Sequence, residues 1–240
     1  MKRIGESIPT IEARRIALRP LTKNDLNSLY AIYSDPQVMR YWGDTPMKNR
    51  SEAQEFLAAV TEDLHRRKGL QWGIARLGDN QAMGTLALFH WDQVAQKCEI
   101  GFALGRAYWG MGFMQEALQV AISFGFDELE IRRIEADVDP RNISAIKLLE
   151  RLGFQKEGYL RERWLVPAET QDSLFYGLLR REWNPANVEY KCILSRSLGT
   201  PQLWRTSNEV RLAQSFLRHW TTVIAHRFRS LGSHSLKTLK

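Results

Sequence analysis

The stretch RAYWGMGFMQEA, residues 106–117, joins an apolar strand predicted over residues 98–104 to a predicted helix. It places Gly110 and Gly112 at the turn between the two elements. Glycine lets a backbone turn sharply and approach a ligand closely, and the free N–H groups at the start of a helix point toward an anion. The turn is therefore either a phosphate site or an ordinary connection between a strand and a helix.

Neither common phosphate loop fits this turn. The dinucleotide fingerprint needs a third glycine at the position that Gln115 occupies, and the nucleotide P-loop needs Gly-Lys-Ser/Thr, which occurs nowhere in the chain. Other parts of the sequence must therefore indicate whether the turn is a phosphate site.

Length and composition indicate a globular protein with one substantial core. The chain has 240 residues, of which 44% are hydrophobic and 25% charged. No apolar run approaches the roughly 20 residues of a membrane span, and no signal-peptide core follows Met1, so we expect a soluble, cytoplasmic protein. Cys98 and Cys192 lie far apart without clustered histidines, which predicts neither a disulfide framework nor a metal site.

Charge divides the chain into two predicted domains. Residues 1–183 contain 25 Lys or Arg and 25 Asp or Glu, whereas residues 184–240 contain 9 basic and 2 acidic residues. We therefore predict one domain over residues 1–183 and a basic C-terminal extension over residues 184–240. A capping-box pattern at residue 206 and apolar spacing to residue 228 predict a helix in the extension.

Hydrophobic periodicity predicts a mixed α/β (α+β) order of elements in the first domain. The meander over residues 70–104 is expected to be antiparallel. Predicted strands cover residues 15–21, 70–77, 82–91, 97–104, 133–138, 159–166 and 174–179, and predicted helices cover residues 22–33, 51–68, 113–129 and 142–152.

Three segments in this order resemble the GNAT superfamily of N-acetyltransferases. They are the glycine turn, IEADVDPRN at residues 134–142 and LERLGF at residues 149–154. The segment YWGMG at residues 108–112 and the series Asp172, Tyr176 and Trp183 resemble the branch of ribosomal-protein N-terminal (alanine/serine) acetyltransferases. The resemblance covers residues 12–183. It implies a mixed, mostly antiparallel central sheet flanked by helices, to which the basic helical extension is added.

The resemblance also implies that acetyl-CoA is the co-substrate. In the family, backbone amides of a Gln/Arg-x-x-Gly-x-Gly/Ala motif bind its pyrophosphate, and the motif positions fall here on Trp109, Gly112 and Met114. Only the central glycine matches, but backbone donors do not depend on side chains. The motif lacks a cation at Met111, for which Arg106 is a candidate substitute unless it is simply a solvated surface residue. The implied cofactor residues are Phe102, Ala103, Leu104, Trp109, Gly110, Met111, Gly112, Phe113, Met114 and Asn142.

Two of these assignments correspond to contacts with pantetheine in the family. Residues 98–104 correspond to a strand that splays from its neighbour, so that pantetheine can pair with its backbone. Asn142 corresponds to an asparagine whose side chain contacts pantetheine, and it is also a candidate N-cap for the following helix.

Acetyl transfer needs a base, because a free amine is mostly protonated at neutral pH. Glu99 is the first candidate, since the family commonly places a carboxylate on this strand, although a structural glutamate paired with a cation is the alternative. His90, Asp92 and Asp172 are weaker candidates. The departing thiolate also needs a proton or stabilisation. The chain has Leu149 where many members carry tyrosine and Ala145 where the branch often carries serine, so Ser144, Tyr176 or water are candidates for this step.

The leading functional hypothesis is direct acetyl transfer in a ternary complex to a primary amine, either a protein N-terminus or a small amine. The alternatives are a non-catalytic acetyl-CoA-binding or sensing module, and a ribosome- or RNA-associated protein that acts through its tail. Homodimer formation is a further expectation. Five aromatic residues either line an acceptor cleft or fill the core: Tyr41, Trp42, Trp72, Trp91 and Trp164.

Overall fold

The computed structural model describes residues 7–166, 169–184 and 188–193. The chain divides into two units, Met1–Pro201 and Gln202–Lys240. All described residues belong to the first unit. The helix predicted over residues 206–228 lies outside the described residues.

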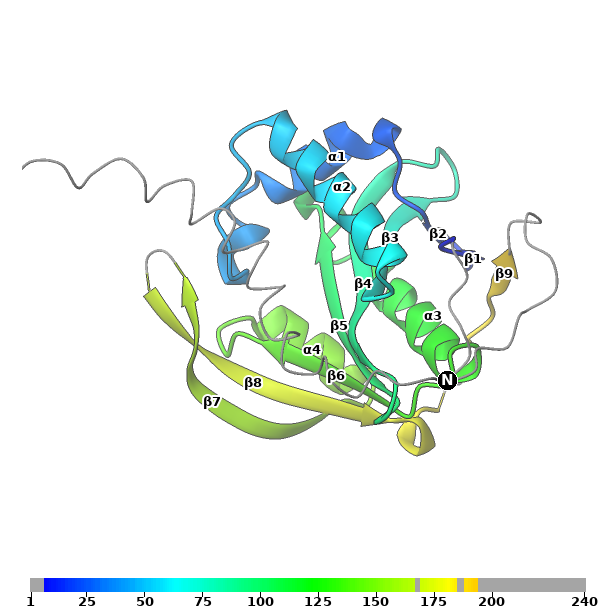
Figure 1. The fold of residues 1–240 in the computed structure, drawn as a ribbon, viewed down its shortest axis with the longest axis vertical. Coiled ribbons are helices and arrows are strands. Elements are labelled where there is room, and N and C mark those ends of the chain that lie inside the picture. Colours follow the sequence, from blue (N-terminus) through cyan, green and yellow to red (C-terminus); the bar gives the residue numbers. More distant parts are fainter. Residues whose placement is uncertain (1–6, 167–168, 185–187, 194–240) are drawn as a thin grey trace, which may run out of the picture. The chain divides into compact units, whose positions relative to one another are not determined.

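A single nine-stranded sheet forms the centre of the first unit, in the order β7-β8-β6-β5-β4-β3-β2-β1-β9 (Figure 1). Neighbouring strands are antiparallel, except that β5 and β6 run parallel. The mostly antiparallel sheet predicted from the sequence is therefore confirmed. The strands are β1 Thr10–Glu12, β2 Ile16–Arg19, β3 Gly69–Arg76, β4 Ala82–Asp92, β5 Lys97–Leu104, β6 Arg133–Val138, β7 Gln155–Val166, β8 Glu169–Leu179 and β9 Lys191–Ile193.

Helices cover both faces of this sheet. Residues of α1 and α2 form an apolar cluster with Ala103 of β5, whereas α3 and α4 pack in a larger cluster that includes Ile100 of the same strand. Because successive side chains of a strand point to opposite faces by odd and even position, Ile100 and Ala103 place the two helix pairs on opposite faces. The helices are α1 Leu26–Tyr33, α2 Arg50–His65, α3 Phe113–Asp127 and α4 Ile143–Arg151, with short 3₁₀ turns at η1 Lys23–Asp25, η2 Met39–Tyr41, η3 Arg106–Tyr108 and η4 Arg180–Glu182.

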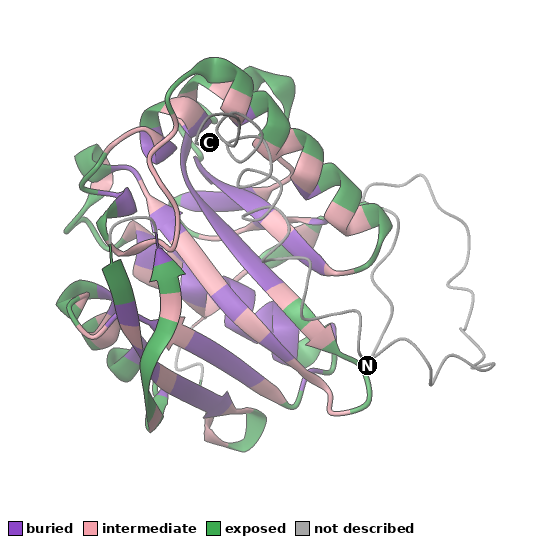
Figure 2. Cartoon of the chain, turned by 60° about the vertical axis from the view of Figure 1, so that its left-hand side comes forward, coloured by how far each residue is buried: buried purple, intermediate pink, exposed green. Residues whose placement is uncertain are grey.

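Trp72 lies in the centre of the larger cluster. It is fully buried on β3, packs edge-on against Phe124 of α3 with ring centroids 5.9 Å apart, and donates its indole N–H to the Pro9 carbonyl at 2.9 Å. Figure 2 shows that the central strands of the sheet are largely buried, as Trp72 is, while β7 at the edge is mostly exposed. Of the two interpretations offered for Trp72, the core position is correct.

The observed elements follow the predictions closely in the middle of the chain. The bounds of β5 and β6 are those expected, whereas β7 begins at Gln155, four residues before the predicted strand. Register shifts after Lys156 and Leu160 interrupt the alternation of β7, which hid its first residues. The strands β1 and β9 were not predicted, because three residues are too few to show an alternating pattern.

The sheet continues beyond residue 183, the predicted end of the catalytic domain. Strand β9 pairs with β1 through Thr10–Ile193, Ile11–Cys192 and Glu12–Lys191. At least these residues of the expected extension therefore join the sheet. In the part of the chain that the structure describes, no helix is both long and apolar enough to cross a membrane.

Candidate active site

A notch opens between β5 and β6. The two strands pair only through Lys97–Arg133, Cys98–Ile134 and Glu99–Glu135, although β5 continues to Leu104 and β6 to Val138. Among the described residues no strand fills the gap, so alternate N–H and C=O groups of residues 100–104 face it rather than a neighbouring strand. Phe102, Ala103 and Leu104, which the sequence predicts as cofactor residues, lie on this unpaired edge.

The strand register assigns the candidate residues to the two faces of the sheet. Glu99 alternates with Ile100 and shares its face with Ala103, which packs beneath α1 and α2. Tyr176 pairs with Ala136 of β6, one residue on from Glu135, the partner of Glu99. Glu99 therefore lies on the face covered by α1 and α2, and Tyr176 on the face covered by α3 and α4.

The glycine turn has the backbone geometry of an anion site. Gly110 and Gly112 have φ values of +74° and +77°, a conformation that other residues adopt only with strain. A Cβ on Gly110 would meet nothing within 4 Å, so its requirement for glycine is conformational and leaves room beside the backbone. Gly112 is also the N-cap of α3 and offers no side chain to cap the helix.

The first turn of α3 therefore presents free donors. The first helical hydrogen bond joins the Glu116 N–H to the Gly112 carbonyl at 3.2 Å, so the N–H groups of residues 113–115 precede it and point out of the helix end. The side chain of Met114 is buried in the core, and the Trp109 indole N–H donates to the Leu104 carbonyl at 2.7 Å. The side chains of Trp109 and Met114 thus fix the loop, and its backbone N–H groups remain available to bind an anion.

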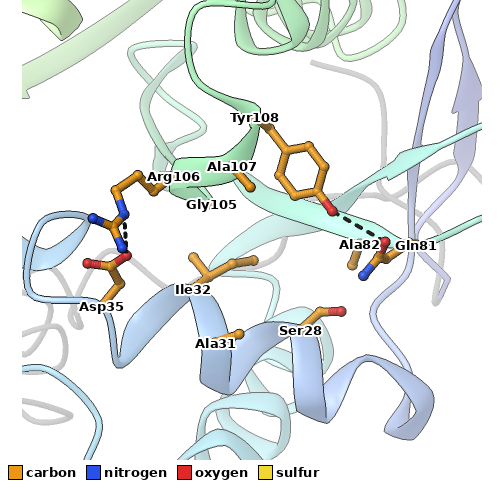
Figure 3. A pocket seen from close by; sticks show the side chains of 10 residues that line it. All are labelled: Ser28, Ala31, Ile32, Asp35, Gln81, Ala82, Gly105, Arg106, Ala107 and Tyr108. Carbon is orange, nitrogen blue, oxygen red and sulfur yellow. Dashed lines mark hydrogen bonds and ion pairs between the residues drawn. The ribbon is translucent and has the colours of Figure 1, made fainter.

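Arg106 forms an ion pair outside the glycine turn. Its Nε lies 3.1 Å from the Asp35 carboxylate of the segment after α1. The two residues lie in a cavity of about 500 Å³ between α1 and η3, where Tyr108 also contacts Gln81 (Figure 3). The structure therefore pairs Arg106 with Asp35. The cation in contact with the glycine turn is instead Arg15, whose Nη1 donates to the Met111 carbonyl at 2.9 Å.

Glu99 stands at the closed end of the notch, in the last pair before β5 and β6 separate. Its carboxylate lies 3.0 Å from Nδ1 of His90, which has a φ of +50° next to a register shift in β4. Neighbouring Glu135 is more buried and is held by Lys97 at 3.0 Å and Arg133 at 2.7 Å. Of the two carboxylates, Glu99 is the one without an Arg or Lys partner among the described residues.

The start of α4 carries Asn142 and Ser144. The Asn142 side chain accepts a hydrogen bond from the Ala145 N–H at 3.1 Å, which confirms its role as N-cap. Ser144 is exposed on the first turn. Ala145 and Leu149 are buried in the core, so the two residues that replace the expected serine and tyrosine serve packing. Contact of Asn142 with pantetheine stays a prediction.

Tyr176 is buried on β8. Its hydroxyl donates to the Glu150 carboxylate of α4 at 3.0 Å. Burial and this hydrogen bond raise its pKa above the ordinary value for tyrosine. A proton on this hydroxyl is therefore held more tightly than on a solvated tyrosine.

A polar cluster occupies the β6 side of the notch, on the face of Glu99. Asp137 accepts hydrogen bonds from Ser173 and from the Trp164 indole N–H at 3.3 Å, and Arg163 lies 3.6 Å away. Trp164 is thus one of the five aromatic residues that does lie beside the notch. Asp172, a weaker base candidate, is instead bonded to Tyr159 of β7.

Arg141 links Asp139 and Glu169 to the α1–α2 segment. It donates to Asp139 at 2.6 Å and to Glu169 at 2.7 Å, and its guanidinium lies 6.0 Å from the ring of Tyr41. The hydrogen bond from Arg141 lowers the pKa of Glu169. Trp42 instead packs edge-on against Tyr33, and Trp91 packs against the core. The side of the notch nearest α1 and α2 is therefore polar, and Asp139 and Glu169 share Arg141 there.

Sequence reasoning missed Arg15, Asp137 and Arg141. Asp137 could have been found, because alternation on β6 places it on the face of Glu135, whereas the contacts of Arg15 and Arg141 span turns that no pattern predicts.

The buried Cys98 has a raised pKa because of desolvation, as expected of an unreactive thiol. No cluster of metal-ligating side chains occurs in the ranges that the structure describes.

Comparison with known proteins identifies similar chains. A family model described as an acetyltransferase (GNAT) domain matches residues 15–155. The chain is 35% identical over 174 residues to the uncharacterized N-acetyltransferase p20 of Bacillus licheniformis, covering 72% of this chain and 98% of p20. It is 31% identical over 140 residues to YdaF of Bacillus subtilis, a proposed ribosomal N-acetyltransferase, covering 57% of this chain and 75% of YdaF.

A solved structure extends the comparison to the fold. Spermidine N-acetyltransferase from Vibrio cholerae, in complex with CoA and spermine, superposes with a TM-score of 0.63 at 21% identity, covering 70% of this chain and 97% of that one. The two proteins share a fold.

Proposed function

The chain belongs to the GNAT acetyltransferase family, and on that premise we propose that it transfers an acetyl group from acetyl-CoA to a primary amine in a ternary complex. The observation that carries the proposal is the glycine turn. Two glycines at positive φ precede a helix end with free N–H groups, and the turn lies directly after the unpaired edge of β5. Pyrophosphate suits the turn, and the amide groups of pantetheine suit the strand edge.

The two faces of the sheet then divide the chemistry. We assign acetyl-CoA to the face of the sheet covered by α3 and α4. The glycine turn leads into α3, Asn142 and Ser144 are at the start of α4, and Tyr176 lies on the face that these helices cover. Glu99 lies on the opposite face, from which the amine approaches. In this arrangement Glu99 accepts the proton of the acceptor ammonium, directly or through water. The nitrogen bonds to the acetyl carbon and the C–S bond breaks. The departing thiolate takes a proton from Ser144, Tyr176 or water, and the proton that the nitrogen loses on forming the amide replaces it, directly or through water.

Ser144 is the better placed of the two proton donors, because it is exposed whereas the Tyr176 hydroxyl is buried and bonded to Glu150. Ser144→Ala is expected to lower kcat by about tenfold, a modest loss because a thiolate is a tolerable leaving group, and Tyr176→Phe by less than about threefold. Steady-state kinetics with saturating acetyl-CoA measure both values. A larger loss in Tyr176→Phe reverses the assignment, and two unchanged rates assign the step to water.

The acceptor is either a protein N-terminus or a small amine. YdaF, by its name, suggests the first class, and the spermine in the Vibrio cholerae structure suggests the second. Beside the notch the carboxylates of Asp137, Asp139 and Glu169 outnumber their partners Arg141 and Arg163 by one. This small excess of negative charge suits an ammonium group, which both classes of acceptor share.

A panel of acceptors tests the proposed reaction. Peptides with N-terminal alanine or serine, spermidine and spermine are each incubated with acetyl-CoA, and free thiol and acceptor mass are followed together. We expect thiol release and a singly acetylated product in equal amounts with one class. Tight acetyl-CoA binding without thiol release from any acceptor would favour the non-catalytic binding module.

A further inference from the structure

Arg15 reaches the glycine turn from a distant part of the sequence. It lies between β1 and β2, where Ala13 donates to the Ile16 carbonyl at 2.9 Å, and its own carbonyl accepts from the Leu77 N–H at 3.1 Å. These bonds fix its backbone on the sheet. Its guanidinium then holds the residue between the two glycines, because Nη1 donates to the Met111 carbonyl at 2.9 Å.

Glu116 is the second residue that binds the Arg15 side chain. The Glu116 carboxylate accepts from both Nε and the backbone N–H of Arg15, each at 2.7 Å. The guanidinium also lies 4.7 Å from the Phe113 ring centroid, and its Nη2 lies 3.4 Å from the position of a Cβ on Gly112. The guanidinium of Arg15 therefore lies beside three consecutive residues of the turn, Met111, Gly112 and Phe113.

The charge of Glu116 makes this contact important for donor binding. Glu116 lies in the first turn of α3, where its negative charge opposes the attraction of the helix end for an anion. Arg15 cancels that charge. The loop has no cation of its own to do so, because Met111 occupies the motif position and Arg106 is paired with Asp35.

We propose that Arg15 supplies, from the connection between β1 and β2, the positive charge that offsets Glu116 beside the pyrophosphate site. It holds the turn through Met111 and neutralises Glu116, and it is thus a positioning residue for donor binding. This inference rests on the proposed function, because it takes acetyl-CoA as the donor.

A four-protein charge cycle tests the inference. CoA affinity is measured by isothermal titration calorimetry for the wild type, Arg15→Gln, Glu116→Gln and the double variant, with melting temperatures to verify folding. Arg15→Gln leaves Glu116 uncompensated and is expected to weaken CoA binding by roughly five- to thirtyfold. The double variant restores neutrality and should recover most of that loss, and Glu116→Gln should bind at least as tightly as the wild type. The loss in Arg15→Gln should shrink at about 1 M salt.

The possible failures are distinguishable. A double variant that binds CoA as weakly as Arg15→Gln would overturn the role of charge, since a purely structural contact is not rescued by removing its second partner. Equal affinities of Arg15→Gln and the wild type would overturn the inference as well. A wild type that fails to bind CoA at all would instead contradict the proposed function.

Discussion

Replacing Glu99 by glutamine is expected to lower kcat by about 100- to 10,000-fold while the affinity for acetyl-CoA stays the same. Glutamine keeps the size of the side chain and a hydrogen-bonding oxygen for His90, but it cannot accept the proton of an ammonium group. Steady-state kinetics with the best acceptor of the panel give kcat, and calorimetry gives the affinity for the donor.

Glu62→Gln is the matched control for this substitution. Glu62 lies on α2 in an exposed ion pair with Arg66 at 2.5 Å, so its loss should leave kcat within about twofold. If Glu99→Gln retained the rate of this control, Glu99 would be a structural partner of His90 and another group or water would take the proton.

Replacing Gly112 by valine is expected to weaken CoA binding by at least about 100-fold. The residue has a φ of +77°, which is strongly disfavoured for a β-branched side chain, and its Cβ would meet Arg15 Nη2 at 3.4 Å. The turn would rearrange to relieve the strain and would take the N–H groups at the start of α3 out of position. Calorimetric titration with CoA measures the loss.

Gly78→Val separates this effect from a general loss of stability. Gly78 lies in the turn between β3 and β4, its φ is outside the left-handed range, and a Cβ there meets nothing within 4 Å. Its variant should bind CoA as the wild type does. Wild-type affinity in Gly112→Val, with an unchanged melting temperature, would show that the turn does not hold the donor.

The parts of the site that the sequence predicted are those that local backbone chemistry determines. The bounds of β5 follow from its alternation, and the sharp turn at Gly110 and Gly112 follows from placing two glycines between a strand and a helix. The N-cap at Asn142 likewise depends on residues within one helical turn. Each of these features needs only neighbours in the sequence.

The parts that the sequence did not predict are contacts between distant segments. Arg15 and Glu116 are separated by 101 positions, and only the packing of β2 beside α3 brings them together. Arg106 is closer to the turn in sequence, but the ion pair with Asp35 holds it toward α1. Proximity in sequence therefore indicated neither the ion pair of Arg15 with Glu116 nor that of Arg106 with Asp35.

The role of Glu99 lies between these two cases. Alternation assigned it correctly to the face opposite Cys98 and Ile100, but its position at the closed end of the notch depends on where β5 and β6 stop pairing. Its contact with His90 depends on a register shift in β4 that no sequence pattern indicated.

Hydrogen–deuterium exchange of the wild type, with and without saturating CoA, tests directly whether the glycine turn binds the donor. We expect slower exchange in the peptide that contains residues 110–116, because the free N–H groups of the turn and of the first turn of α3 would donate to pyrophosphate. Unchanged exchange in this peptide, under conditions in which calorimetry shows CoA bound, would place the donor elsewhere and contradict the proposed site.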